Sequence, residues 1–309
     1  MPVLRARAGL NQRVRRFFQQ RDVLEVETPL LCSSGVTDPS LEPLVVAEGD
    51  SLARPRYLQT SPEYAMKRLL ASGSGAIFQI ARAFRDGEAG SRHNPEFSLL
   101  EWYRPGFDHH QLMLEVADLV QECLGERPVV FHSYRQLFLN SLGVDPFTAS
   151  IEELEQLARR QLDAGSLSGD RDLWLDLLMS HVIEPGLDGP ELYFVYDYPA
   201  SQAALARTVM TDGVLVAQRF ELYVDGIELA NGYFELLDAA EQRRRFAADN
   251  TRRRKGGKPE RPLDEYLLAA MESGLPSCAG VALGLDRLLM LVSGCSDIRQ
   301  VLAFDWQHC

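Results

Sequence analysis

The stretch at residues 76–103, AIFQIARAFRDGEAGSRHNPEFSLLEWY, alternates apolar and polar side chains on both sides of a charged loop. This pattern predicts a strand, a polar loop and a second strand that pairs back on the first. The side chains expected on one face are Gln79, Ala81, Ala83, Arg85, Phe97, Leu99, Glu101 and Tyr103. Small alanines beside an arginine leave room for a ligand, and the polar and aromatic groups suit a phosphate, a purine and an amine. The alternative is an ordinary hairpin whose surface charges are solvated.

A second stretch, residues 277–292, reads SCAGVALGLDRLLMLV and predicts a glycine-bearing strand that runs into an apolar helix. Asp286 and Arg287 stand at the junction. A charged pair inside such an apolar run costs free energy unless it is paired or functional. The alternative is a structural Asp286–Arg287 ion pair that closes the start of the helix.

The third stretch, residues 219–238, places Glu221, Glu228, Asn231 and Glu235 on a predicted hairpin whose turn is Asp-Gly at 225–226. Clustered carboxylates suit Mg²⁺ bound to phosphates, or a substrate ammonium. Glu228 and Asn231 differ in strand parity, so a shared pocket requires a bulge or a strand end near Gly232. The alternative is a solvated acidic edge.

The other segments predict an α+β fold, an antiparallel sheet flanked by helices, because strands and helices alternate without a regular βαβ rhythm. Apolar spacing predicts a helix from the start of the chain to about Asp22, followed by a strand at 23–28. Capping pairs predict helices that start after Asp108, with Gln111, and after Ser150, with Glu153. The polar, mostly helical stretch around 145–189 is expected to be an insertion in a single domain spanning 1–309.

Composition narrows the class of protein. The 309 residues contain five scattered cysteines, without zinc-finger spacing, which favours reduced thiols and no structural metal. No apolar run has the roughly 20 residues that cross a bilayer, so a cytoplasmic protein without a membrane contact is expected. The net charge of −12 argues against binding a polyanion over the whole surface.

Three segments of the chain resemble, in the right order, the three motifs of class II aminoacyl-tRNA synthetases. The first motif corresponds to residues 13–29 ending VLEVETP, the second to FRDGEAGSRHNPEFSLLEWY and the third to GVALGLDRLLML. Within that class, YLQTSPEYAMKRLL at 57–70 and GIELANGY at 226–233 are similar to lysyl-tRNA synthetases. The resemblance implies an antiparallel sheet of six to seven strands, and a homodimer with the first motif at its interface.

The resemblance also implies an ATP site. Arg85 would grip the α-phosphate and Arg287 the γ-phosphate, while Phe97 would stack on adenine. Glu228 would coordinate Mg²⁺. The other residues of the implied ATP site are Asp86, Gly87, Glu88, His93, Asn94, Leu229 and Gly284. Relatives usually have a glutamate that touches ATP where this chain has Gly87, and here Glu88 stands beside that position.

For the amino acid, the resemblance implies a pocket with carboxylates for two ammonium groups. Glu63, in the Ser61-Pro62-Glu63 element, would face the backbone-side amine. Glu235 and Tyr103 would take the side-chain ammonium. Glu101 and Asn231 would assist them. A lysine-like substrate would then attack the α-phosphate with its carboxylate, which needs no general base because it is already ionised.

Two departures from lysyl-tRNA synthetases favour a different acceptor. Ala282 stands where they have the middle glycine of the third motif, and only about a dozen residues precede the first motif, where they carry an anticodon-binding domain. Both features resemble the elongation factor P lysine ligases, which activate (R)-β-lysine and transfer it to a lysine of that factor. Elongation factor P is therefore the expected protein partner, without stable tRNA binding.

Two alternatives remain for the whole chain. It could be a truncated lysyl-tRNA synthetase that still charges tRNA, or a synthetase-like regulator without catalysis. Retention of Arg85, Glu228 and Arg287 argues against the regulator. The basic tract at 243–245 and 252–255 could dock an acidic partner, although a solvated helix face explains it as well.

Overall fold

The computed structural model describes residues 2–46, 55–163, 165 and 167–309. In this part of the chain, nine strands form one sheet in the order β1-β5-β6-β12-β11-β10-β8-β7, with β9 paired to β10. Neighbouring strands are antiparallel except for the pairs β1/β5 and β7/β8. The strands are β1 (Leu24–Glu25), β5 (Ile77–Phe84), β6 (Glu96–Pro105), β7 (Val129–Ser133), β8 (Leu192–Pro199), β9 (Thr208–Thr211), β10 (Val214–Val224), β11 (Ile227–Phe234) and β12 (Cys278–Gly284).

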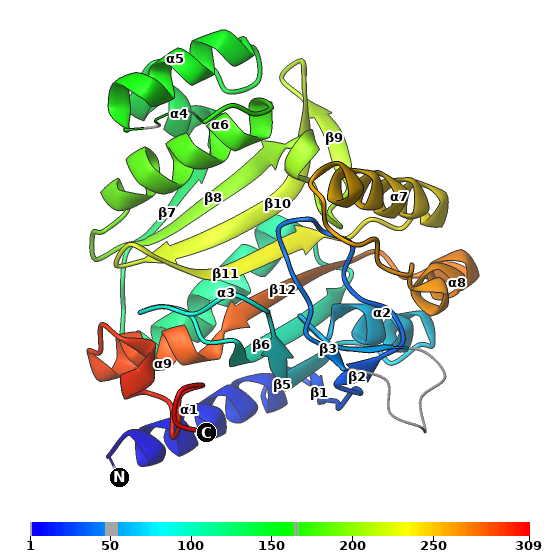
Figure 1. Ribbon diagram of the computed structural model, residues 1–309. Coiled ribbons are helices and arrows are strands. Elements are labelled where there is room, and N and C mark those ends of the chain that lie inside the picture. The colour runs from blue at the N-terminus through cyan, green and yellow to red at the C-terminus, as the bar shows by residue number, and fades with distance from the viewer. Residues whose placement is uncertain (1, 47–54, 164, 166) are drawn as a thin grey trace.

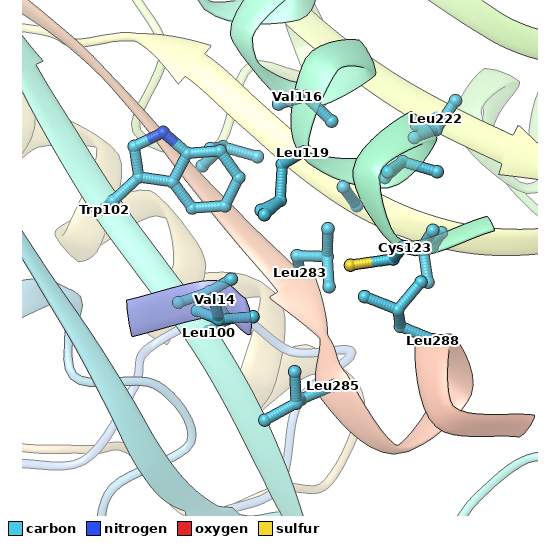
Figure 2. Close-up of a cluster of buried hydrophobic side chains, with 14 of the residues drawn as sticks. Val14, Leu100, Trp102, Val116, Leu119, Cys123, Leu222, Leu283, Leu285 and Leu288 are labelled. Atoms are coloured by element: carbon cyan, nitrogen blue, oxygen red, sulfur yellow. The ribbon is translucent and has the colours of Figure 1, made fainter. Parts of the chain in front are cut away.

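Three helices cover one face of the sheet: α1 (Pro2–Gln19), α3 (His109–Leu124) and α9 (Leu285–Ser293). The core lies between this helical layer and the strands. Figure 2 shows part of it, with Leu100, Leu222 and Leu283 of the sheet and Val14, Leu119 and Leu288 of the helices. The apolar spacing that predicted the first helix is confirmed, because Leu10, Val14, Phe17 and Phe18 are its buried residues.

Helices cover the opposite face at its two ends (Figure 1), and a cavity lies between them. At the β8 end lie α4 (Tyr134–Leu142), α5 (Ile151–Gln161) and α6 (Arg171–Leu178), continued by a π-helical turn at Met179–Ile183 and a 3-10 turn at Glu184–Gly186. At the other end lie α2 (Glu63–Ala71), α7 (Ala239–Lys255), α8 (Glu265–Gly274) and the small sheet of β2 (Leu31–Cys32), β4 (Arg56–Leu58) and β3 (Val45–Val46). Two further 3-10 turns span Ala200–Gln202 and Ile298–Gln300.

Several predicted elements are confirmed. Both capping boxes are formed, by Asp108 with Gln111 and by Ser150 with Glu153. The turn between β10 and β11 has positive φ at Asp225 and Gly226, as a two-residue hairpin turn requires. The segment 145–189 is mostly helical, apart from residues 164 and 166, which lie outside the described residues, and the helical cover already begins with α4.

Other expectations were wrong in detail. The strand at 23–28 is only Leu24–Glu25, because the chain leaves the sheet edge after the N–H of Val26 donates to Phe78. The bulge lies at Leu229 and not near Gly232, since β11 has one extra residue between the partners of Leu222 and Tyr223. The sheet has more strands than the six to seven implied, because β1 and β7 add strands at its two edges and β9 pairs with the start of β10. Among the described residues, no helix is long and apolar enough to cross a membrane.

Candidate active site

A cavity of about 640 Å³ opens on the uncovered centre of the sheet. Its floor is made by strands β6, β12 and β11, and its walls come from the β5–β6 loop, the start of α2 and the start of α9. The predicted site residues that line it are Ser61, Pro62, Glu63, Arg85, Glu88, His93, Asn94, Phe97, Glu101, Tyr103, Glu228, Leu229, Asn231, Glu235, Ala282, Gly284 and Arg287. Asp86 and Gly87 are the two predicted residues outside this lining, in the turn that follows β5.

One end of the cavity is basic and aromatic. The guanidinium carbon of Arg85 lies 5.0 Å from the ring centre of Phe97, the strand residue that register pairs with Ala83. The Nε of Arg85 is buried without a hydrogen-bond partner, and its Nη1 lies 3.7 Å from Glu88. An unsatisfied guanidinium N–H beside an aromatic face suits a bound nucleotide, which supplies both an anionic acceptor and a flat ring.

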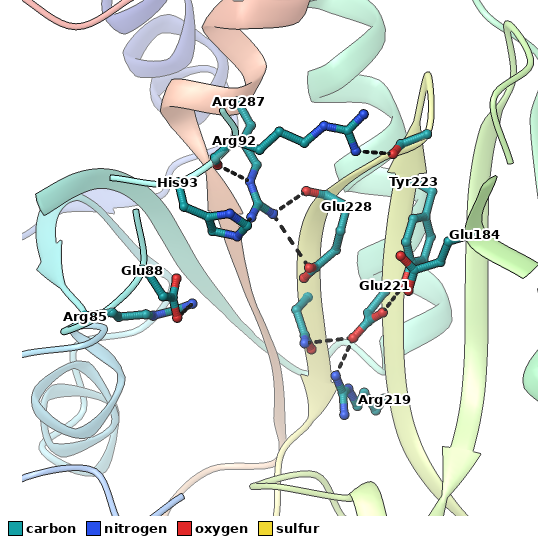
Figure 3. Close-up of polar contacts among 12 residues, drawn as sticks. Arg85, Glu88, Arg92, His93, Glu184, Arg219, Glu221, Tyr223, Glu228 and Arg287 are labelled. Carbon is teal, nitrogen blue, oxygen red and sulfur yellow. Dashed lines mark hydrogen bonds and ion pairs between the residues drawn. The ribbon is translucent and has the colours of Figure 1, made fainter. Parts of the chain in front are cut away.

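Arg287 stands across the cavity from Arg85, at the start of α9 (Figure 3). Its Nη1 donates to the backbone carbonyl of Glu228 at 2.7 Å, and its Nη2 lies 2.7 Å from Nε2 of His93. Burial and the charge of Arg287 lower the pKa of His93, so the neutral ring accepts this hydrogen bond. The arginine is therefore held in place by its neighbours before any ligand arrives.

Asp286, the neighbour of Arg287, also borders the cavity, but its contacts give it a structural role. Its carboxylate contacts Arg7 of α1 at 2.5 Å and accepts the backbone N–H of Ser98 at 2.7 Å. The Asp286–Arg287 ion pair considered from the sequence is wrong, because Asp286 bonds to a different arginine. The pair with Arg7 ties α1 to α9 and fixes the backbone that carries Arg287.

Glu228 lines the cavity, whereas the neighbouring Glu221 lines a smaller hollow beside it, and the two carboxylates differ in their partners. Glu221 accepts hydrogen bonds from Tyr198 at 2.7 Å, Tyr223 at 2.5 Å and Asn231 at 3.1 Å, and it is also paired with Arg219. Glu228 lies 3.6 Å from Nη1 of Arg287. The bulge at Leu229 explains how Glu228 and Asn231 both reach the cavity despite their unequal parity.

The side chains of the cavity suit a metal ion only if a bound ligand supplies further oxygen atoms to it. Among the described residues, no group of three or more His, Cys, Asp and Glu side chains is placed to hold a metal. Mg²⁺ characteristically takes one or two carboxylates and completes its shell with water and substrate phosphates. Glu228, which lines the cavity 3.6 Å from Nη1 of Arg287, fits that pattern.

The other end of the cavity is acidic. The carboxylate of Glu101 accepts hydrogen bonds from Tyr103 at 2.8 Å and Ser61 at 2.9 Å. Burial raises the pKa of Glu101 to about 8 and that of Glu235 to about 7. Such an enclosed set of carboxylates favours a cationic ligand, because ionising them without one is costly.

The floor of this acidic end consists of very small residues. Ala282 of β12 pairs with Glu101 on one side and Asn231 on the other, so its methyl group lies between them. A Cβ at Gly280 would collide with the ring of Tyr103 and with Glu235. The space for a ligand here therefore depends on the absence of a Cβ at Gly280 and on the methyl group of Ala282.

Sequence reasoning missed two charged residues of the site. Lys67 Nζ contacts Glu63 at 2.7 Å and Glu235 at 2.5 Å, and Arg219 holds Glu221. Lys67 follows Glu63 by four helical positions, which is a pairing that spacing alone could have suggested. Arg219 alternates with Glu221 on one strand face, which also was a readable signal.

Comparisons with known proteins agree with this architecture. Residues 1–307 match the family described as tRNA synthetases class II (D, K and N). A protein of Pseudoalteromonas translucida (strain TAC 125), named elongation factor P–(R)-beta-lysine ligase, is 50% identical over 307 residues, which are 98% of this chain and 94% of the relative. A Salmonella typhi protein of the same name is 47% identical over 310 residues, 98% of this chain and 95% of the relative. The chain therefore belongs to the class II tRNA synthetases (D, K and N), as a ligase grouped with the relatives named elongation factor P–(R)-beta-lysine ligase.

Proposed function

We propose that this ligase uses ATP to activate (R)-β-lysine, or lysine, as an aminoacyl-adenylate and transfers it to a lysine side chain of elongation factor P. The observation that carries the proposal is the polarity of a single cavity. Its basic, aromatic end suits ATP, and its acidic end suits an amino acid with two amines. The names of the relatives supply the acceptor and the substrate isomer.

At the nucleotide end, Arg85 binds the α-phosphate and Arg287 the γ-phosphate, while Phe97 stacks on adenine. The unpartnered Nε of Arg85 and the fixed position of Arg287 support these roles. Glu228 would hold Mg²⁺ together with phosphate oxygens. When bound, Mg²⁺ neutralises charge on the phosphates.

At the amine end, Glu63 and Glu235 receive the two ammonium groups, with Tyr103, Glu101 and Asn231 around them. The substrate carboxylate then points toward Arg85. One carboxylate oxygen attacks the α-phosphorus, an O–P bond forms, and the bond from the α-phosphorus to the bridging oxygen breaks to release pyrophosphate. Arg85 stabilises the negative charge that develops on the phosphorus, as preorganised donors do in acyl and phosphoryl transfer.

In the second half-reaction, the neutral amine of an acceptor lysine attacks the carbonyl carbon of the adenylate. An N–C bond forms, the C–O bond to the phosphate breaks, and AMP leaves. The ammonium of the acceptor must first lose a proton, which a carboxylate near the cavity mouth accepts. The net charge of −12 also disfavours broad contact with tRNA and supports a protein acceptor.

The proposal extends to assembly and location. We expect a single catalytic domain, supported by one sheet that runs through all three core clusters. A homodimer built on the first motif is supported by exposed leucines in and just after it, namely Leu24 at 57%, Leu30 at 39% and Leu31 at 46% exposed. Action on a translation factor places the protein in the cytoplasm.

Pyrophosphate exchange with a panel of lysine isomers tests the activation step. Exchange that depends on ATP, Mg²⁺ and a diamino acid, with (R)-β-lysine preferred, supports the proposal. Exchange that is absent with every isomer would leave a regulator without catalysis. A strict preference for α-lysine together with charging of tRNA would identify a truncated lysyl-tRNA synthetase.

A further inference from the structure

Both carboxylates proposed for the substrate's amines are already bonded to an amine of the protein. Nζ of Lys67 lies 2.7 Å from Glu63 and 2.5 Å from Glu235. The side chain of Lys67 is 2% exposed, and it reaches the two carboxylates from α2 without itself lining the cavity. Glu63 and Glu235 do line the cavity, so they stand between a fixed ammonium and the ligand space.

The choice of lysine at this position is itself informative. Only three of the 32 lysines and arginines in the chain are lysines, at positions 67, 255 and 258. The other two are exposed, whereas Lys67 is buried. A compact ammonium serves two carboxylates as a point charge, whereas a guanidinium is a planar fork that requires more room and more acceptors.

We infer that Lys67 is a positioning residue for substrate selection: its ammonium pairs with Glu63 and Glu235 and holds the two carboxylates at a fixed separation, so that the pocket receives a substrate with two amines. The inference rests on the proposed function. Burial raises the pKa of Glu101 to about 8, so that carboxyl is mostly protonated at pH 7 and adds little negative charge. Lys67 contacts Oε1 of Glu63 and Oε2 of Glu235, which leaves the second oxygen of each carboxylate for an ammonium group of a diamino acid.

The groups that face this cluster come from different elements of the fold. Glu63 and Lys67 come from α2, Glu101 and Tyr103 from β6, Glu235 from the end of β11, and Cys278 from β12. Burial raises the pKa of Cys278 to about 12 and that of Tyr103 well above its usual value, so both are neutral at pH 7. The charge that a ligand meets therefore depends on Glu63, Glu235 and Lys67, because Glu101 is mostly protonated at pH 7.

Loss of Lys67 has a defined direction. Burial already raises the pKa of Glu235, and the charge of Lys67 opposes that shift. Without the ammonium, the pKa of Glu235 rises further and the carboxyl is protonated at neutral pH. A neutral carboxyl binds an ammonium group more weakly, so substrate binding then requires a higher pH.

The experiment compares Lys67→Met, which keeps the length of the side chain, with the exposed control Lys255→Met. KM and kcat for L-lysine and for (R)-β-lysine are measured by pyrophosphate exchange from about pH 6 to about pH 9, a range that spans the shifted carboxyl groups. Lys67→Met is expected to raise KM by about tenfold or more at pH 7, the effect of one pKa unit. The excess shrinks toward pH 9, kcat changes less, and the control behaves as the unaltered protein. An unchanged KM, or a rise that is equal at every pH, overturns the inference.

A measurement on the unaltered protein covers the case in which Lys67→Met does not fold. With ¹⁵N-labelled lysine, the ammonium signal of the buried residue is followed by NMR while L-lysine and (R)-β-lysine are added in turn. A change in the chemical shift of that signal upon binding supports the inference. A chemical shift that stays the same when a diamino acid binds overturns it. Absence of exchange with every isomer counts against the proposed function instead, and the NMR titration still reports on Lys67.

Discussion

Arg287 contacts both the backbone and the side chain of Glu228. The Nη1 of Arg287 donates to the backbone carbonyl of Glu228 at 2.7 Å and lies 3.6 Å from the carboxylate of the same residue. These two contacts and the neutral ring of His93 hold the guanidinium in position. A preorganised cation next to a candidate metal ligand is the arrangement that stabilises charge on phosphates without reorganisation during the reaction.

Removing either cavity arginine should therefore reduce activation more than it changes folding. Arg85→Ala and Arg287→Ala are each expected to lower the rate of pyrophosphate exchange by about 100-fold or more, as loss of a transition-state charge donor does. Arg244→Ala, on the exposed face of α7, is the matched control and should exchange normally. Near-normal exchange in either cavity variant would take that arginine out of the mechanism.

Ala282 should help to select the substrate isomer. Its methyl group lies between Glu101 and Asn231, so Ala282→Gly enlarges the pocket at the amine end. The expected change in relative kcat/KM is a shift toward α-lysine worth about 1 to 3 kcal/mol, the usual effect of one methyl-sized change. The ratio of kcat/KM for α-lysine and (R)-β-lysine is the measurement, and an unaltered ratio would rule out this role.

The buried carboxyl of Glu101 should make stability depend on pH. Burial raises the pKa of Glu101 from 4.5 to about 8 in the folded protein. Between these values the folded state holds a proton that the unfolded state has lost, so the free energy of unfolding falls as pH rises through this window. Glu101→Gln removes that dependence. The difference in Tm between Glu101→Gln and the unaltered protein should increase from pH 5 to pH 8. The exposed Glu152→Gln variant is the control. A difference in Tm that stays constant over this range would contradict the raised pKa of Glu101.

Asp286 should matter for stability and, through the backbone, for Arg287. Asp286→Ala leaves the buried N–H of Ser98 without its acceptor and leaves Arg7 with the carbonyl of Val301 as its remaining partner. Loss of one partner from such a pair is expected to destabilise the fold by about 3 kcal/mol. Denaturant unfolding measures the change, and Asp188→Ala, at an exposed loop position, is the control. An Asp286→Ala protein as stable as the control would show that the pair with Arg7 is dispensable.

Local sequence patterns were enough to predict much of the fold. Apolar spacing predicted α1, capping pairs predicted the starts of α3 and α5, and alternation predicted the pairing of β5 with β6. Each of these depends on residues close together in the chain. The resemblance to class II synthetases then placed most of the candidate site, since its motifs supplied the residues that line the cavity.

Features that depend on residues distant in the chain could not be predicted from the sequence. Asp286 and Arg7 are 279 positions apart, so nothing near Asp286 indicated its partner. The bulge at Leu229 is a property of how β10 and β11 pair, and parity alone could show only that some irregularity was needed. Lys67 was overlooked because Glu235, its second partner, lies on a different strand and becomes its neighbour only in the folded chain.

The most direct test of the proposed activity is the identity of the acceptor. The enzyme is incubated with ATP, Mg²⁺ and labelled (R)-β-lysine, together with purified elongation factor P in one reaction and total tRNA in another. The account predicts that label appears on elongation factor P and that its appearance depends on ATP. Mild base should not release this label, because an amide bond attaches it. Label on tRNA with none on elongation factor P would contradict it.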